Sequence, residues 1–162
     1  MDQKLNPRYM HYKAISGSIS VLFITIILLF SSVASFVDGA AGVGAVFVIL
    51  ALVIIAIGVG ISYLSAYLDY KNYRYGVTKE GFRKQFGVLN LRNTMIPYEK
   101  IQNVDIRRPL MMRIFGLSSL YIQTAGGSSF ATVSEGSLPG LDPATAEKLQ
   151  ADLIARSKQA KA

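Results

Sequence analysis

The sequence predicts an α+β protein in which two transmembrane helices precede a small antiparallel β domain that ends in a helix. Two long apolar stretches, residues 14–37 and 39–68, contain no charged residue. The following residues alternate apolar and polar side chains with the period of a β-strand, and the end of the chain has the apolar period of a helix. We therefore expect an N-terminal arm (1–13), a helical hairpin (14–70) and a C-terminal domain (71–162).

The two uncharged stretches are each long enough to cross a bilayer. A helix needs about 20 apolar residues to span a hydrocarbon core of about 30 Å, and only Asp38 separates the two stretches. A cleavable signal peptide is an alternative for the first stretch, because Ser32-Val33-Ala34 resembles a cleavage site. The apolar region of a signal peptide usually has about 7–15 residues, which is shorter than 14–37, so a hairpin is the preferred interpretation.

Positive charge predicts the orientation of this hairpin. Lys and Arg concentrate on the cytoplasmic side of short flanks, and they occur at both outer ends of the hairpin but not in its turn, residues 38–42. We therefore expect both termini in the cytoplasm. Tyrosines at the outer ends predict interfacial aromatic belts. The flanking cations are Lys4, Arg8, Lys13, Lys71, Arg74 and Lys79, and the tyrosines are Tyr9, Tyr12, Tyr63, Tyr67 and Tyr70.

The composition of the spans favours an anchor over a transporter. Neither span contains an internal ionisable residue, and proton or ion pathways normally need such groups. Small residues four apart let helices approach closely, so we expect the pairs Ala56/Gly60 and Ser62/Ala66 at the helix contact.

The C-terminal domain is expected to be a run of antiparallel strands with two helices. Pro97 predicts a sheet edge or a bulge, and residues 102–103 predict a kink. Pro109 opens and Gly116 closes a short helix, and Asp142-Pro143 begins the amphipathic final helix. The expected strands are 73–78, 82–88, 94–98, 101–106, 117–124 and 130–133, with a turn at 125–129, a loop at 137–141 and helices at 110–116 and 143–157.

Several motifs in this domain resemble those of bacterial membrane-anchored PH-like domains, the YdbS-like group. They are YGVTKEG (75–81), IPYEKIQNV (96–104), RIFGL (113–117), TAGG (124–127) and LPGL (138–141). The resemblance implies a PH-like split antiparallel β-barrel of about seven strands capped by the C-terminal helix, at the plasma membrane of a bacterium. Eukaryotic PH domains bind phosphoinositides through basic residues in the first hairpin loop. Here that turn is only Lys79-Glu80-Gly81, so phosphoinositide binding is not implied.

Residues that carry chemistry are scarce, which argues against an enzyme. The chain has no cysteine and only one histidine, His11, so thiolate and His/Cys metal sites are excluded. It has neither a phosphate-binding Gly-rich loop nor a G-x-S-x-G motif. Glu99 and Asp105 are the only neighbouring carboxylates in the strand region, and a solvated role is preferred for them. We expect no catalytic residue, metal or cofactor.

Net charge suggests an anionic partner. The chain carries +7, and 14 Lys/Arg against 7 Asp/Glu follow Asp69. Such a balance suits anionic lipid, nucleic acid or an acidic protein, although an ordinary solvated surface is the alternative. Segment 107–115 mixes arginines with apolar residues, which is typical of headgroup contact. The candidate headgroup- or partner-binding residues are Arg83, Lys84, Arg107, Arg108, Leu110, Met111, Arg113 and Phe115.

These observations favour a non-enzymatic binding or scaffolding module at the cytoplasmic membrane face. Its expected partners are the bilayer, anionic lipid headgroups or another membrane protein, in a homo- or hetero-oligomer. A regulatory subunit of a membrane transport or envelope-stress complex is the second interpretation. Nucleic acid is not expected, because the tether holds the basic domain beside lipid.

Overall fold

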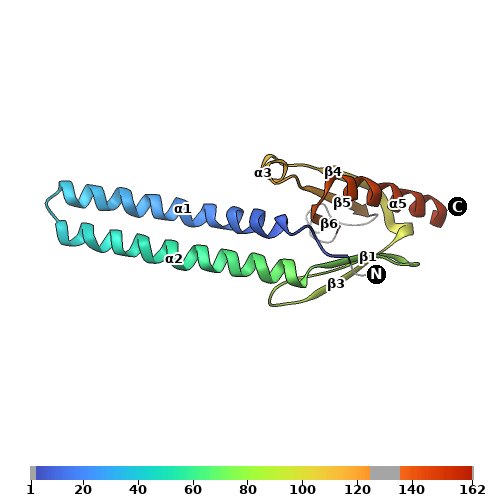
Figure 1. Ribbon diagram of the computed structural model, residues 1–162, viewed down its shortest axis with the longest axis horizontal. Helices are drawn as coiled ribbons and strands as arrows, with labels where there is room; N and C mark the ends of the chain where they lie inside the picture. Colours follow the sequence, from blue (N-terminus) through green and yellow to red (C-terminus); the bar gives the residue numbers. More distant parts are fainter. Residues whose placement is uncertain (1–2, 125–135, 162) are drawn as a thin grey trace. The chain divides into compact units, whose positions relative to one another are not determined.

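The computed structural model describes residues 3–124 and 136–161. The chain divides into two compact units. We call Lys13–Tyr67 the helical unit, and Met1–Tyr12 with Leu68–Ala162 the sheet unit. The elements in chain order (Figure 1) are α1 (Arg8–Val37), α2 (Ala41–Asn72), β1 (Arg74–Val77), β2 (Gly81–Phe86), β3 (Arg92–Pro97), the 3-10 turn η1 (Tyr98–Lys100), β4 (Ile101–Arg107), α3 (Leu110–Ile114), β5 (Ser118–Thr124), β6 (Ser137–Leu141) and α5 (Pro143–Lys161).

The helical unit contains all but the outer turns of α1 and α2, which have 30 and 32 residues. At about 1.5 Å per residue each extends about 45 Å, which exceeds the thickness of a bilayer core of about 30 Å. Both helices are long and apolar enough to cross a membrane. Gly39 makes the turn between them with a φ of 77°, a left-handed conformation that glycine adopts without a steric penalty.

Small residues form the contact between α1 and α2. A Cβ atom added to Gly58 would lie 2.6 Å from Cγ1 of Val21, and Ser32 Oγ donates a hydrogen bond to Gly44 O at 3.0 Å. The predicted pair Ala56/Gly60 is wrong as a contact, because Gly60 faces open space. Gly44, Ala51 and Gly58 recur at intervals of seven, and Ala51 is fully buried. A seven-residue period keeps one helix face on its neighbour.

The sheet unit contains two antiparallel sheets of three strands, in the orders β1-β2-β3 and β4-β5-β6. Its core includes Phe82 from the first sheet and Leu120 from the second, both with no exposed surface. The predicted edge at Pro97 is confirmed because β3 ends its sheet, and the predicted kink appears as a register shift between Ile101 and Asn103. The described residues form two separate sheets and no closed barrel, so the barrel inferred from the resemblance is not confirmed.

The final helix packs as its apolar period predicts. Ala146, Leu149 and Leu153 are buried, and α5 contacts β4, β5 and η1 (Figure 1). Polar contacts reinforce this packing, because Ser157 Oγ and Lys161 Nζ donate hydrogen bonds to the carbonyl of Ile101.

Residues 137–141 form strand β6, whereas the sequence predicts a loop there. Pro139 and Gly140 favour a turn, but Leu138 pairs with Leu120 and Leu141 with Ser118. A register shift between Ser118 and Leu120 accommodates the irregular pairing. The predicted turn at 125–129 and strand at 130–133 lie outside the described residues.

The N-terminal arm packs into the sheet unit. Gln3 forms an antiparallel bridge with Tyr75 of β1, and Leu5 and Tyr9 are buried in the core. The ring of Tyr9 lies against Gly140, where an added Cβ would come within 2.6 Å of it. The prediction that Tyr9 belongs to an interfacial belt is therefore wrong, because the ring is buried among core residues.

Candidate functional site

The candidate segment 107–115 is built around α3, whose ends the sequence predicts. Pro109 precedes the helix with a φ of −54°, the value to which its ring is restricted. Gly116 leaves it with a φ of 66°. Met112 fixes the turn in the core, because its side chain is 6% exposed and its Sδ accepts a hydrogen bond from Ser119 Oγ at 3.0 Å. This anchor leaves Leu110, Arg113 and Ile114 at the surface.

Two apolar side chains of α3 are strongly exposed. Leu110 is 71% exposed and Ile114 is 70% exposed, and residues four apart share one helix face. Met111 and Phe115 are half-buried. The ring of Phe115 meets that of Tyr12 edge to face, with centroids 6.1 Å apart. Tyr12 lies near the start of α1 and belongs to the sheet unit, so this contact holds Phe115 and the end of α3 against that part of the unit.

The three arginines around α3 have different surroundings. Arg107 lies over the ring of Tyr121, 4.7 Å from its centroid. Arg108 forms an ion pair with Glu147 at 3.0 Å, which offsets its charge. Arg113 is exposed, and within residues 3–124 and 136–161 its side chain has no ion pair. Arg113 is thus the cation of this segment best placed to meet an external anion.

Arg83 and Lys84 lie on opposite faces of the first sheet, because successive side chains of a strand alternate. Arg83 is exposed, whereas Lys84 is 4% exposed. Lys84 Nζ donates a hydrogen bond to Ser137 O at 2.8 Å and lies 4.5 Å from the ring centroid of Phe86. This lysine therefore links the two sheets, and its ammonium group is not at the surface, unlike the side chain of Arg83.

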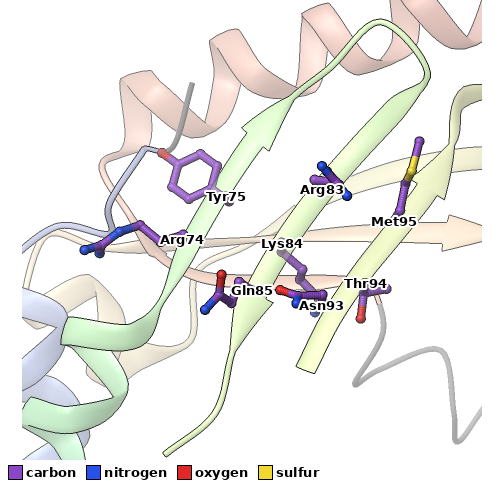
Figure 2. Close-up of a pocket in the computed structure, with 8 residues that line it drawn as sticks. All are labelled: Arg74, Tyr75, Arg83, Lys84, Gln85, Asn93, Thr94 and Met95. Atoms are coloured by element: carbon purple, nitrogen blue, oxygen red, sulfur yellow. The ribbon is translucent and has the colours of Figure 1, made fainter. Parts of the chain in front are cut away.

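The outer face of β1-β2-β3 carries a shallow hollow of about 310 Å³ (Figure 2). Register places Arg74, Gln85 and Asn93 in one row across the three strands, and Arg83 and Met95 in the next. No carboxylate lines the hollow, although Arg74 Nη1 donates a hydrogen bond to Tyr73 O at 3.1 Å. The lining residues are Arg74, Tyr75, Arg83, Lys84, Gln85, Asn93, Thr94 and Met95.

Sequence reasoning missed one exposed apolar feature, the tip of the hairpin between β2 and β3. Leu89 is fully exposed and Leu91 is 53% exposed. The sequence predicts only a connection at 91–93. The segment Val-Leu-Asn-Leu at 88–91 could have indicated this feature, because connections between strands are usually polar and this one is rich in apolar residues.

The described part of the chain offers no metal site, since no three His, Cys, Asp or Glu side chains gather there in a group that could hold an ion. Tyr73, one of the buried tyrosines of the core, is also a poor candidate for acid–base chemistry. Burial raises the pKa of Tyr73, and its hydroxyl donates a hydrogen bond to Ser137 O at 3.2 Å. This phenol therefore stays neutral at physiological pH and serves as a structural donor.

Comparison with protein families identifies the fold family. The family model described as a bacterial PH domain matches residues 17–157, which includes most of both apolar helices as well as both sheets. Searches of curated proteins and of solved structures gave no match. PH-like domains are generally non-catalytic binding modules. Since the match covers most of the 162 residues, the chain belongs to the bacterial PH domain family.

Proposed function

We propose that this protein is a membrane-anchored PH-domain protein that acts as a binding or scaffolding module at the cytoplasmic face of a bacterial plasma membrane. Helices α1 and α2 would be the spans. Their support is length, apolar composition and the family match, which begins inside α1. The distribution of Lys and Arg supports cytoplasmic termini, because both outer flanks are basic and the turn at 38–42 has neither residue.

The proposed binding surface is Leu110, Arg113 and Ile114, which we call the α3 surface. One observation carries this proposal: Phe115 contacts Tyr12, two residues before the uncharged stretch begins. If α1 spans the membrane, its cytoplasmic end holds α3 at headgroup depth. There, two exposed apolar side chains enter the interface and an arginine meets anionic lipid, gaining about 1 kcal/mol.

This surface revises the set of candidates that the sequence gives. Ile114 replaces Met111 and Phe115 as the apolar contact, because those two side chains are half-buried and Ile114 is 70% exposed. Arg107 and Arg108 stay as secondary contacts, since Tyr121 and Glu147 already engage them. Lys84 is left out because it is buried.

A regulatory role toward a protein partner is the second candidate. The hollow on β1-β2-β3 favours it, because Arg74 and Arg83 line a concave face without a carboxylate (Figure 2). Strand β3 also ends its sheet, and an edge strand can pair with an added strand. An extended acidic segment of a partner would suit both features.

Cysteine labelling tests the topology directly, because the chain has no native cysteine. Ala41→Cys in the turn is expected to react with a membrane-impermeant maleimide in spheroplasts. Lys158→Cys on α5 should react only after the membrane is permeabilised. Labelling of Lys158→Cys in intact spheroplasts would overturn the proposed orientation.

A fluorescent probe tests the α3 surface in the full chain. Leu110→Cys labelled with an environment-sensitive dye is expected to emit at shorter wavelength in anionic vesicles than in neutral ones. The difference should shrink as salt rises, because charge attraction is screened over about 8–10 Å at physiological salt. Equal emission in anionic vesicles, neutral vesicles and detergent would contradict the proposal.

A further inference from the structure

The tip of the β2–β3 hairpin, residues 87–91, exposes apolar side chains on a tightly closed turn. Gly87 has a φ of 121°, and an added Cβ there would overlap the carbonyl of Asn90, so only glycine closes this turn without strain. The closed turn presents Leu89 with its whole side chain exposed and Leu91 half-exposed. Exposed leucines at a tip are costly in water, and clustered exposed apolar residues mark interaction sites.

A hydrogen bond fixes the tip beside the end of the second long helix. Asn72, the last residue of α2, donates from Nδ2 to Gly87 O at 3.1 Å. Asn72 lies five residues after Tyr67, which is about 7.5 Å along a helix. The headgroup layer on each side of a bilayer core is about 5–7.5 Å thick. If Tyr67 lies at the edge of the core, Asn72 and the tip lie at the outer side of the headgroup layer.

Charge around the tip suits an anionic membrane. Arg92 follows the tip and is exposed, and Lys71 precedes Asn72 and is exposed. Residues 81–98 contain no Asp or Glu, so no carboxylate of β2, the tip or β3 would oppose a lipid phosphate. The tip therefore combines exposed leucines with exposed cations, as the α3 surface does.

We propose that Leu89 and Leu91 insert into the headgroup layer of the same membrane that α1 and α2 cross. The tip and the α3 surface would then dock the sheet unit at two points, one beside each long helix. The inference rests on the proposed membrane anchoring, and it adds a second lipid contact on a different hairpin. Two contacts would fix the orientation of the sheets, whereas one contact would let the unit rotate about α3.

Depth-dependent quenching tests this inference in the full chain. Leu89→Cys and Leu110→Cys, each labelled with the same dye, are reconstituted into vesicles of phosphatidylglycerol and phosphatidylcholine. Part of the phosphatidylcholine carries a nitroxide near its headgroup. Both probes are expected to be quenched several-fold more than a matched probe at Lys158→Cys, an exposed position on α5. The substituted residues are exposed, so the variants should fold, which unchanged melting in detergent would verify.

The outcomes separate the inference from the function on which it rests. Quenching at Leu110→Cys without quenching at Leu89→Cys would overturn the second contact and leave the proposed α3 surface intact. No quenching at either position would overturn both. A blue-shifted but unquenched probe at Leu89→Cys would mean that protein, such as a second copy of the chain, covers the tip, and would also overturn the inference.

Discussion

The helical unit and the sheet unit place large apolar side chains in opposite positions. In the helical unit Phe23 and Phe30 are 67% and 78% exposed, whereas Ala51 is buried. In the sheet unit Phe82 and Leu153 have no exposed surface. Water drives large apolar groups into a protein core, whereas lipid gives them no such drive. Contacts between helices in a membrane are therefore enriched in small residues, which let the helices approach closely. This difference is the one expected if the helical unit faces lipid, as proposed, and the sheet unit faces water.

Among the described residues of the sheet unit, four follow the pattern of the helical unit instead. Leu89, Leu91, Leu110 and Ile114 are each more than half exposed. They lie on the hairpin tip and on α3. Each of these segments has a contact with a residue of one long helix, the tip with Asn72 of α2 and Phe115 after α3 with Tyr12 of α1. In our account these exceptions are the part of the sheet unit that meets lipid.

The largest expected effect comes from the core of the sheet unit. Leu153→Ala should lower its free energy of unfolding by about 2–5 kcal/mol, because a buried cavity forms. Leu153→Asp and Leu149→Asp should cost more, because an unpaired charge enters an apolar interface. Ile114→Ala is the matched control and should stay within about 0.5 kcal/mol in detergent. Urea denaturation, monitored by tyrosine fluorescence, measures these changes. Parent-like melting of both aspartate variants would mean that α5 does not pack as described.

The next largest effect tests the contact of small residues between α1 and α2. Gly58→Leu should destabilise the helix pair by about 1–3 kcal/mol, because its Cβ would meet Val21 and force the helices apart. Gly60→Leu is the matched control, since nothing lies within 4 Å of its added Cβ. Unfolding of the helix pair in sodium dodecyl sulfate measures the difference. Equal stability of the two variants would contradict the small-residue contact.

A smaller effect concerns lipid charge. Replacing Arg107, Arg108 and Arg113 together by Ala should weaken docking of the full chain's sheet unit to anionic vesicles by at most about 1 kcal/mol per residue. Arg113→Ala alone should account for most of the change, because Arg108 is paired with Glu147. The emission shift of a dye at Leu110→Cys reports the docking.

The control for this charge effect is a triple Ala variant at Lys148, Arg156 and Lys158 of α5. It should dock like the parent, since Arg156 is already paired with Asp152 at 2.8 Å. An unaffected Arg107/Arg108/Arg113 variant would assign those arginines to an ordinary solvated surface.

The last expected effect is a loss of stability at alkaline pH in the sheet unit. Burial raises the pKa of Tyr73 above its ordinary value of 10.0, so above pH 10 the unfolded chain releases a proton that the folded chain retains. The stabilisation is complete below about pH 10 and is lost as pH rises toward the folded-state pKa. At one pH unit above 10 the loss should be about 1.4 kcal/mol for this tyrosine. Tyr73→Phe should remove that part of the pH dependence, as urea titrations across this range would reveal.

Local patterns predicted the elements that depend on nearby residues. The uncharged stretches indicated α1 and α2, the Pro109 and Gly116 pair indicated α3, and Pro97 indicated an edge strand. Each of these signals is a property of a short segment, such as the fixed φ of proline or the freedom of glycine. The sequence was therefore sufficient for the helices and for most strands.

Features that depend on distant partners could not be read from the sequence. Tyr9 is buried through packing against Gly140, and β6 forms despite Pro139 because β5 provides a partner. Lys84 is inside because Ser137 accepts its hydrogen bond. The arm also supplies Leu5 and Tyr9 to the core, so a fragment 72–162 would lack two core residues and the full chain is needed for binding measurements.

Nitroxide accessibility tests the central claim, that the helical unit and the four exposed apolar residues face lipid while the rest of the sheet unit faces water. Spin labels at Phe30→Cys, Ile114→Cys and Lys158→Cys would be compared in reconstituted vesicles with oxygen, which partitions into lipid, and with a water-soluble nickel complex. We expect oxygen to relax the label at residue 30 more strongly than the labels at the other two positions. The label at residue 114 should be relaxed by both agents, and the label at residue 158 mainly by the nickel complex. Nickel access at residue 30 equal to that at residue 158 would contradict the account.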